Sequence, residues 1–304
     1  MFVAIYSIFV FIFLGYFAKS MRMLGNRQGN ILLGFLLNFA LPSAILSGVY
    51  HSDISLELLG TLLGALCCSA AVGALSYVFV AKILRYSFLT SVTIAFLVTL
   101  HNTLFLGVPM VYGAVGLEAS HKAIIFDQFC TGLPLAILTP ILFSLSGKGR
   151  FSMRAVGARL FMNPLFLAML SGFALRLLSF SIPEEIFAPI KALAACATPV
   201  ALFAIGVQIS FKDVKIEWKS SLIVLSFAMF VTPALYLASL HLLGTPITQN
   251  HQMALIELSM PPLISSAAVI ARAGLNQKIA LASIVFGIFV SAFTTPLWRY
   301  LSSL

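Results

Sequence analysis

The run Thr99-Leu100-His101-Asn102-Thr103-Leu104-Phe105-Leu106-Gly107-Val108-Pro109 lies in the middle of an apolar segment long enough to cross a membrane. Pro109 has no N–H to donate, and its ring collides with the carbonyl of Phe105, so a break in the helix is expected here. Inside the hydrocarbon core, a broken backbone is tolerated only where it is buried in protein or lines a wet cavity. The run therefore predicts a functional break in a membrane-spanning helix.

The composition of the whole chain agrees with a membrane location. Of its 304 residues 61% are hydrophobic and 9% are charged, and the mean hydropathy is +1.06. Soluble domains carry about 25% charged residues. The first 18 residues lack a basic segment and a small-residue cleavage site, so they read as a first span rather than a signal peptide. We expect an integral protein of a plasma membrane or a bacterial inner membrane, with lipid as its surroundings.

Ten apolar segments approach the length of about 20 residues that a membrane-spanning helix needs. Their expected limits are 2–18, 30–50, 57–80, 88–112, 122–145, 163–180, 186–209, 220–243, 252–271 and 279–298. The fold class is therefore an all-α membrane protein with ten transmembrane helices.

The charged residues predict the orientation of these spans. All but four of the 18 lysines and arginines fall in one set of alternate loops, and the exceptions are Lys122, Arg176, Lys191 and Arg299. Cytoplasmic loops carry an excess of basic residues. The basic loops should therefore face the cytoplasm, and both termini should lie outside.

The ten spans divide at the longest basic loop into two groups of five. The expected parts are a first repeat at 1–145, a cytoplasmic connector at 146–162 and a second repeat at 163–304. Because five is odd, the two halves enter the membrane with opposite polarity, as in the inverted repeats of many secondary transporters. Interruptions at corresponding positions of such halves point to a binding site. Here they occur in the fourth span, at the run quoted above, and in the ninth span, at residues 257–266.

The fourth span offers groups that suit an organic anion. Asn102 and Pro109 are about two helical turns apart, and Thr103 adds a hydroxyl. A break would turn the N–H groups and the positive dipole end of a half-helix toward an anion. The alternative is a buried asparagine that joins helices. We assign the neighbouring His101 to packing.

The ninth span places an acid beside two prolines. Pro261 and Pro262 should leave two helical carbonyls unmatched, and Glu257, Pro261 and Ser265 would share one stripe of a continuous helix. A charged acid at the membrane centre costs about 2.5–3.5 kcal/mol. A proton or a cation should therefore accompany Glu257, which makes it a candidate coupling group; the alternative is a neutral, structural glutamate.

Two weaker positions complete the predicted site. Asn38 near Pro42 is assigned to the substrate, and Thr198 near Pro199 to the coupling ion. Both positions could instead serve packing, because proline kinks are common in membrane helices. The sequence of Gly60-x-x-x-Gly64 is typical of close helix contacts, within one protomer or in a homodimer.

Other classes of function lack sequence support. The basic residues form no aromatic-interleaved face for nucleic acid. The four cysteines are not spaced for a metal, and the chain has no phosphate-binding loop, zinc-protease motif or dinucleotide fingerprint. We therefore expect no enzyme activity, no metal and no cofactor apart from a coupling H⁺ or Na⁺.

Several motifs resemble those of the auxin efflux carrier family. They are Asn102-Thr103-Leu104-Phe105-Leu106-Gly107-Val108-Pro109, Ala197-Thr198-Pro199-Val200-Ala201-Leu202-Phe203-Ala204-Ile205-Gly206, Met260-Pro261-Pro262 and Ser291-Ala292-Phe293-Thr294-Thr295-Pro296-Leu297. The resemblance covers the whole chain. It is specific for the family, whose members include plant carriers and bacterial malate-permease-like proteins, and not for a substrate.

This resemblance implies a fold like that of the bile-acid/sodium symporters, with scaffold and transport domains each drawn from both repeats. The broken fourth and ninth spans would cross at the membrane centre, where Asn102, Pro109 and Pro261 match family motif positions. It also implies elevator-like movement and small carboxylate substrates, malate-like or auxin-like. Glu257 stands where plant members carry a neutral amide, which favours ion coupling here. The alternatives are an uncoupled carboxylate carrier and a membrane receptor that binds without transport. One geometric expectation follows, namely that Pro109 and Pro261 approach each other.

Overall fold

The computed structural model describes residues 2–149, 151–178, 182–209 and 211–303. Within these ranges every regular element is a helix, and the only β-type pairing is an isolated antiparallel bridge between His101 and Pro262. The α-helices are α1 (Phe2–Ser20), α2 (Asn26–Phe35), α3 (Leu41–His51), α4 (Leu56–Val78), α5 (Phe88–Thr99), α6 (Val108–Ala114), α7 (Leu117–Asp127), α8 (Leu133–Leu145), α9 (Met153–Phe161), α10 (Pro164–Leu177), α11 (Glu184–Gln208), α12 (Phe211–Ser226), α13 (Thr232–Leu242), α14 (Gln249–Leu258), α15 (Ile264–Arg272) and α16 (Gln277–Leu301).

Six helical stretches among the described residues are long and apolar enough to cross a membrane. They are Arg27–His51, Leu56–Ile83, Leu117–Leu145, Glu184–Gln208, Ile216–Leu242 and Gln277–Leu301. Shorter apolar helices cover Ile5–Ser20, Phe88–Thr99, Thr103–Ala114 and Pro164–Leu177. The protein is thus an all-helical membrane protein, as predicted, while the ten-helix arrangement with a 5+5 repeat stays a prediction.

The chain folds into two compact units, and each unit takes segments from both halves of the sequence. Unit 1 comprises Met1–Asp53, Leu104–Gln128 and Ala158–Ile209. Unit 2 comprises Ile54–Thr103, Phe129–Gly157 and Ser210–Leu304.

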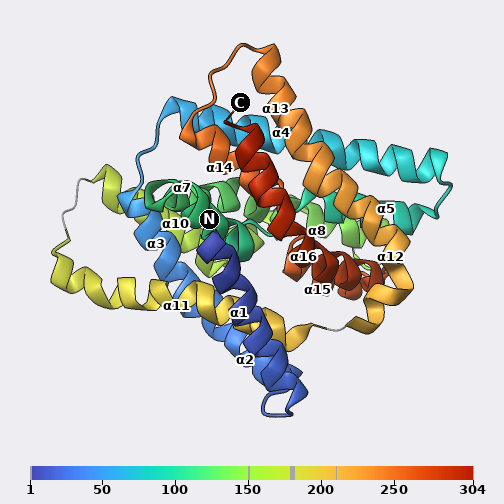
Figure 1. Ribbon diagram of the computed structural model, residues 1–304, viewed down its shortest axis with the longest axis horizontal. Coiled ribbons are helices and arrows are strands. Elements are labelled where there is room, and N and C mark those ends of the chain that lie inside the picture. The colour runs from blue at the N-terminus through green and yellow to red at the C-terminus, as the bar shows by residue number, and fades with distance from the viewer. Residues whose placement is uncertain (1, 150, 179–181, 210, 304) are drawn as a thin grey trace. The chain divides into compact units, whose positions relative to one another are not determined.

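In unit 1, helices α1 and α11 cross in close contact (Figure 1). The crossing depends on two glycines, because a Cβ on Gly15 would overlap the carbonyl of Phe203, and one on Gly206 would overlap the carbonyl of Ile12. Small residues allow two backbones to approach closely in this way. Helix α3 packs against α7, α10 and α11 in the same unit.

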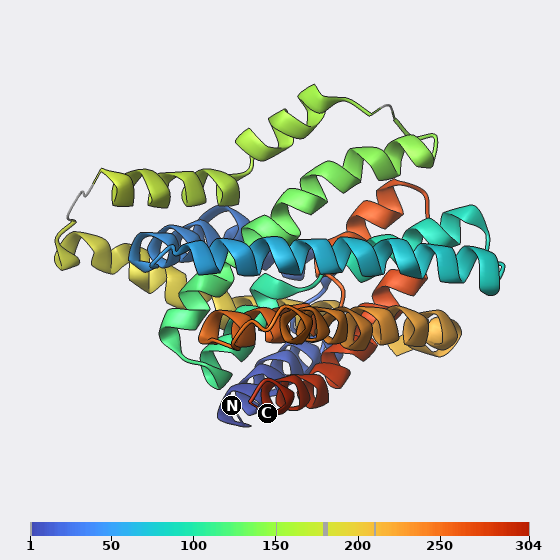
Figure 2. The ribbon, with the colours of Figure 1, turned by 90° about the horizontal axis from the view of Figure 1, so that it is seen from above.

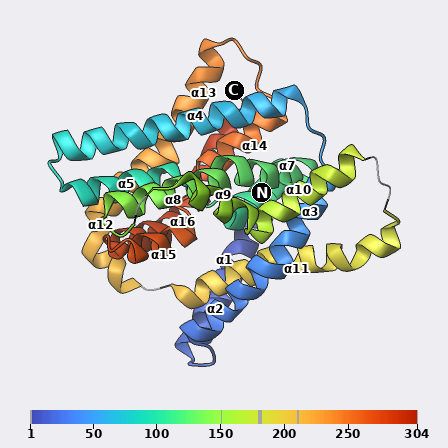
Figure 3. The same cartoon turned by 180° about the vertical axis from the view of Figure 1, so that it is seen from behind.

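Unit 2 is built around a helical hairpin and a helix pair. The long helix of α4 and its π-helical extension Phe79–Ile83 is seen along its length in Figure 2. It returns into α5 at a tight turn, which is visible in Figure 3. Helix α16 packs along α12, and the indole Nε1 of Trp298 donates a hydrogen bond to the carbonyl oxygen of Met229 at 3.0 Å.

Prolines coincide with π-helical turns in this fold. Four of the π-helical turns, Leu36–Ala40, Thr103–Gly107, Gln128–Gly132 and Phe227–Val231, end two residues before a proline. A proline cannot donate to the carbonyl four residues earlier and collides with it. A wider π turn just before the proline lets the helix continue past this defect.

Candidate functional site

Two chain segments meet in unit 2 where α5 and α14 both stop. The N–H of Asn102 donates to the carbonyl oxygen of Pro261 at 2.7 Å, and the N–H of Leu263 donates to that of Leu100 at 2.8 Å. These two bonds form a short antiparallel ladder around the bridge between His101 and Pro262. We call the paired residues 100–102 and 261–263 the crossover. Each of the two bonds satisfies a backbone donor and a backbone acceptor that lie outside any helix.

Side chains reinforce this pairing from both sides. The Nδ1 of His101 donates to the carbonyl oxygen of Met260 at 3.1 Å, and the Thr103 and Thr131 hydroxyls lie 2.9 Å apart. His101 and Thr103 are buried. His101 is buried, as its assignment to packing predicts, and its imidazole also joins the two segments.

The Asn102 side chain is the unusual group of the crossover. It is 0% exposed, and neither its Oδ1 nor its Nδ2 has a hydrogen-bond partner among the described residues. A buried polar group without a partner costs about 1–3 kcal/mol. An amide held in this state by a paired backbone is ready to receive a ligand or a water molecule.

Glu257 lies at the end of the helix that leads into the crossover. Its side chain is 0% exposed and sits in the last turn of α14, where the helix dipole is negative. Glu257 is thus an acid buried at a negative helix end, four residues before Pro261 of the crossover. The N-terminal, positive end of α15 begins at Ile264, directly after the crossover.

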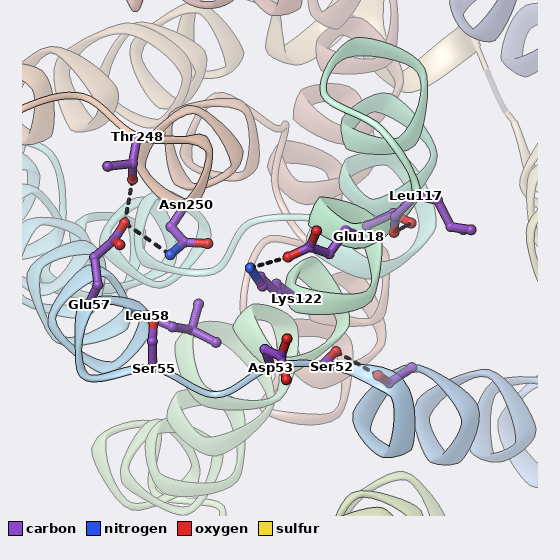
Figure 4. Close-up of polar contacts among 12 residues, drawn as sticks. Ser52, Asp53, Ser55, Glu57, Leu58, Leu117, Glu118, Lys122, Thr248 and Asn250 are labelled. Carbon is purple, nitrogen blue, oxygen red and sulfur yellow. Dashed lines mark hydrogen bonds and ion pairs between the residues drawn. The ribbon is translucent and has the colours of Figure 1, made fainter.

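The far end of α14 is anchored to α4. The carboxylate oxygen Oε1 of Glu57 accepts hydrogen bonds from the Thr248 hydroxyl and, at 3.0 Å, from the Asn250 amide (Figure 4). Both donors lie at the start of α14, where a negative charge is stabilised by the helix dipole. The half-helix that carries Glu257 is thus held at both ends.

Helix α16 supports the crossover from behind. A Cβ on Gly287 would overlap Pro261 and come within 2.9 Å of Leu225. In addition, the Thr294 hydroxyl donates to the carbonyl oxygen of Ser259 at 3.4 Å. Gly287 is therefore required for the close approach of α16 to the broken segment.

A cavity of about 520 Å³ lies in unit 1, lined by residues of α3, α6, α7 and α11. Pro109, Tyr112 and Thr198 are among the lining residues, with Ser120 and His121 as further polar groups. We call this hollow the unit-1 cavity. Two of the predicted site residues, Pro109 and Thr198, therefore face one cavity.

The structure corrects three details of the predicted breaks. The fourth span is interrupted at residues 100–102, and Pro109 lies in the first turn of α6, where a proline is tolerated. The ninth span stops at Leu258 and restarts at Ile264, so Glu257 and Ser265 share no continuous helical stripe. The carbonyl of Glu257 is also not left unmatched, because it accepts the N–H of Met260 at 3.2 Å.

The remaining predicted residues have the following places. Pro261 and Pro262 are buried within the crossover, whereas Ser265 is exposed and its neighbour Ser266 is buried. Asn38 is exposed and its amide donates to the carbonyl of Gly34 within its own helix. Pro109 belongs to unit 1 and Pro261 to unit 2, so their approach stays a prediction.

Comparison with known proteins gives one family and several relatives. The family described as membrane transport protein matches residues 1–150 and 148–299. An uncharacterized transporter of Methanothermobacter thermautotrophicus is 26% identical over 298 residues, which cover 96% of this chain and 95% of the relative. An uncharacterized transporter of Methanocaldococcus jannaschii is 26% identical over 306 residues, covering 97% and 96%. The uncharacterized transporter YfdV of Escherichia coli K12 is 22% identical over 305 residues, covering 98% and 96%.

Proposed function

We propose a specific activity from the premise that this chain belongs to the membrane transport protein family, the family of the auxin efflux carriers, and is a membrane transporter. The proposed activity is secondary transport of a small organic anion, a malate-like or auxin-like carboxylate. We propose further that transport of the anion is coupled to protons or sodium ions and proceeds by elevator-type alternating access.

The observation that carries this proposal is the unpartnered amide of Asn102 inside a paired, non-helical crossover. An amide can donate to a carboxylate through Nδ2 and accept from a hydroxyl through Oδ1. The nearby N-terminus of α15 favours negative charge. Together these groups suit the carboxylate end of a substrate.

Glu257 supports the coupled form of the proposal. A cation beside the carboxylate, or a proton on it, would neutralise a group that is buried at a negative helix end. Binding of that ion would change the charge next to the substrate amide, and the two binding events would then be linked. Thr198 lines the unit-1 cavity and is assigned a secondary role in ion coupling.

The division into two units supports an elevator mechanism. Each unit draws on both halves of the chain, as expected where one unit carries the site and the other serves as a scaffold. We propose that unit 2, which holds the crossover, is the moving part.

The test is uptake into proteoliposomes. Purified protein is reconstituted, and the uptake of labelled malate, lactate and indole-3-acetate is measured with and without gradients of protons and sodium. The proposal expects saturable uptake of at least one acid that a gradient accelerates. Saturable uptake that no gradient changes would favour the uncoupled carrier, and binding without uptake would favour the receptor.

A further inference from the structure

A second hollow of about 620 Å³ adjoins the unit-1 cavity and shares lining residues with it. The shared set includes Ser47, His121 and Ala195, and the second hollow adds His51, Glu118 and Lys191. We call this second hollow the vestibule. His51, Glu118 and Lys191 are exposed, so the vestibule is the open side and the unit-1 cavity is the deeper one.

The fixed charges around the vestibule neutralise one another. On α7, Lys122 pairs with Glu118 at 2.7 Å, as Figure 4 shows. On α11, Lys191 pairs with Glu184 at 2.5 Å. Arg176 of α10 pairs with Asp53. The other acid at the start of α11, Glu185, is exposed and does not line the vestibule.

Two histidines, His51 and His121, also line the vestibule. The imidazoles of His51 on α3 and His121 on α7 are neighbours, with ring centroids 6.3 Å apart and ring planes inclined at 39°. Histidine is the side chain that gains or loses a proton between about pH 5 and pH 8. Two protonated rings at this distance repel each other, so an anion between them favours the uptake of a proton.

Neighbouring groups fix the position of the His51 ring. The Nδ1 of His51 donates to the carbonyl oxygen of Ser47 at 2.7 Å, which leaves Nε2 as the ring nitrogen that can contact an anion. The ring also packs edge-on against Phe187, with centroids 5.4 Å apart, which fixes its orientation. No described residue makes a hydrogen bond to the His121 imidazole.

We propose that His51 and His121 bind the carboxylate of an organic anion in the vestibule, with uptake of a proton, before the anion enters the unit-1 cavity. This inference rests on the proposed transport of organic anions. Each oxygen of the carboxylate accepts a hydrogen bond from one imidazole. The added proton on the histidine pair balances the negative charge of the carboxylate. Affinity then rises as the pH falls, because the anion is bound by the form of the histidine pair that holds the added proton.

Equilibrium binding with a histidine pair variant tests this inference. Labelled malate, lactate and indole-3-acetate are compared first, and the acid that binds most tightly is the probe. Its dissociation constant is measured on purified full-length protein at about pH 6 and about pH 8. The wild type should bind about tenfold more tightly at the lower pH. The double variant His51→Gln/His121→Gln should lose most of that difference, while His241→Gln, an exposed histidine on α13, should keep it.

Calorimetry in buffers of different ionisation enthalpy adds a direct readout, since the wild type should take up protons on binding and the pair variant fewer. If the pair variant keeps the affinity, the pH dependence and the proton uptake of the wild type, the vestibule site is refuted while anion transport stands. If the wild type neither binds nor transports any of the three acids, both proposals fail.

Discussion

The N–H of Asn102 donates to the carbonyl oxygen of Pro261 at 2.7 Å, and this bond joins two interrupted helices that belong to different halves of the chain. The N–H of Leu263 donates in turn to the carbonyl oxygen of Leu100, so the two segments are paired by two hydrogen bonds in a short ladder. The Asn102 backbone is therefore fixed, while its side-chain amide keeps both of its polar atoms available among the described residues.

The first prediction concerns the support of this ladder by α16. The variant Gly287→Ala places a methyl group where Pro261 lies, so the crossover must shift. Overpacking of this kind costs about 1–3 kcal/mol. We expect a lower melting temperature and lower anion uptake, measured on the same purified protein. Gly34→Ala is the control, because a Cβ there meets no heavy atom within 4 Å; equal behaviour of the two variants would contradict the role of Gly287.

A second prediction addresses the crossing of α1 and α11 in unit 1. In Gly206→Ala the new Cβ overlaps the carbonyl of Ile12, a backbone atom that cannot rotate away. The helices must separate and lose packing along the contact. Expression as a monodisperse protein in detergent should fall sharply, as judged by size-exclusion chromatography, and the effect should exceed that of Gly34→Ala. A monodisperse Gly206→Ala protein with an unchanged melting temperature would rule out this crossing.

The third prediction uses a double-mutant cycle in unit 2. Pro233 cannot donate to the carbonyl of Met229, and Trp298 donates to that carbonyl instead. Trp298→Phe should destabilise the protein by about 1–3 kcal/mol, because the buried carbonyl loses its partner. Pro233→Ala adds an N–H four residues after Met229, so Trp298→Phe should cost less in that background. Additive losses in thermal unfolding would show that the two residues are independent.

The fourth prediction concerns ion coupling. Glu257→Gln keeps the size of the side chain and removes its charge, so uptake should lose its dependence on the proton or sodium gradient. Glu185→Gln removes an exposed acid and should keep that dependence. Proteoliposome uptake under imposed gradients measures both variants. An unaltered gradient dependence in Glu257→Gln would assign this residue a structural role.

Composition and motifs predicted the class of the fold and the family, because both depend on patterns that repeat along the chain. The two interrupted spans were also visible, since a polar amide and paired prolines are conspicuous in apolar helices. The location of the first break was wrong. Pro109 lies in the first turn of α6, directly after a π-helical turn, so it does not interrupt the helix. The helical conformation ends instead at Leu100, where the sequence carries no signal for a break.

The partners of the crossover could not be predicted, because they come from distant parts of the chain. The bonds of His101 to Met260 and of Thr103 to Thr131 depend on tertiary packing. The same holds for Gly287, whose importance appears only once Pro261 is placed against it. The vestibule was missed for another reason. His51, His121 and Lys191 lie on three different helices, and a search of single spans for polar groups does not combine them.

The most direct test of the central claim is the initial rate of uptake of the transported acid by Asn102→Ala in proteoliposomes, at equal amounts of reconstituted protein. The crossover model predicts that uptake falls to the level of empty vesicles, while the melting temperature stays close to that of the wild type. Asn30→Ala, which changes an exposed asparagine of α2, should transport like the wild type. Wild-type uptake by a folded Asn102→Ala protein would contradict the claim that the crossover amide binds the substrate.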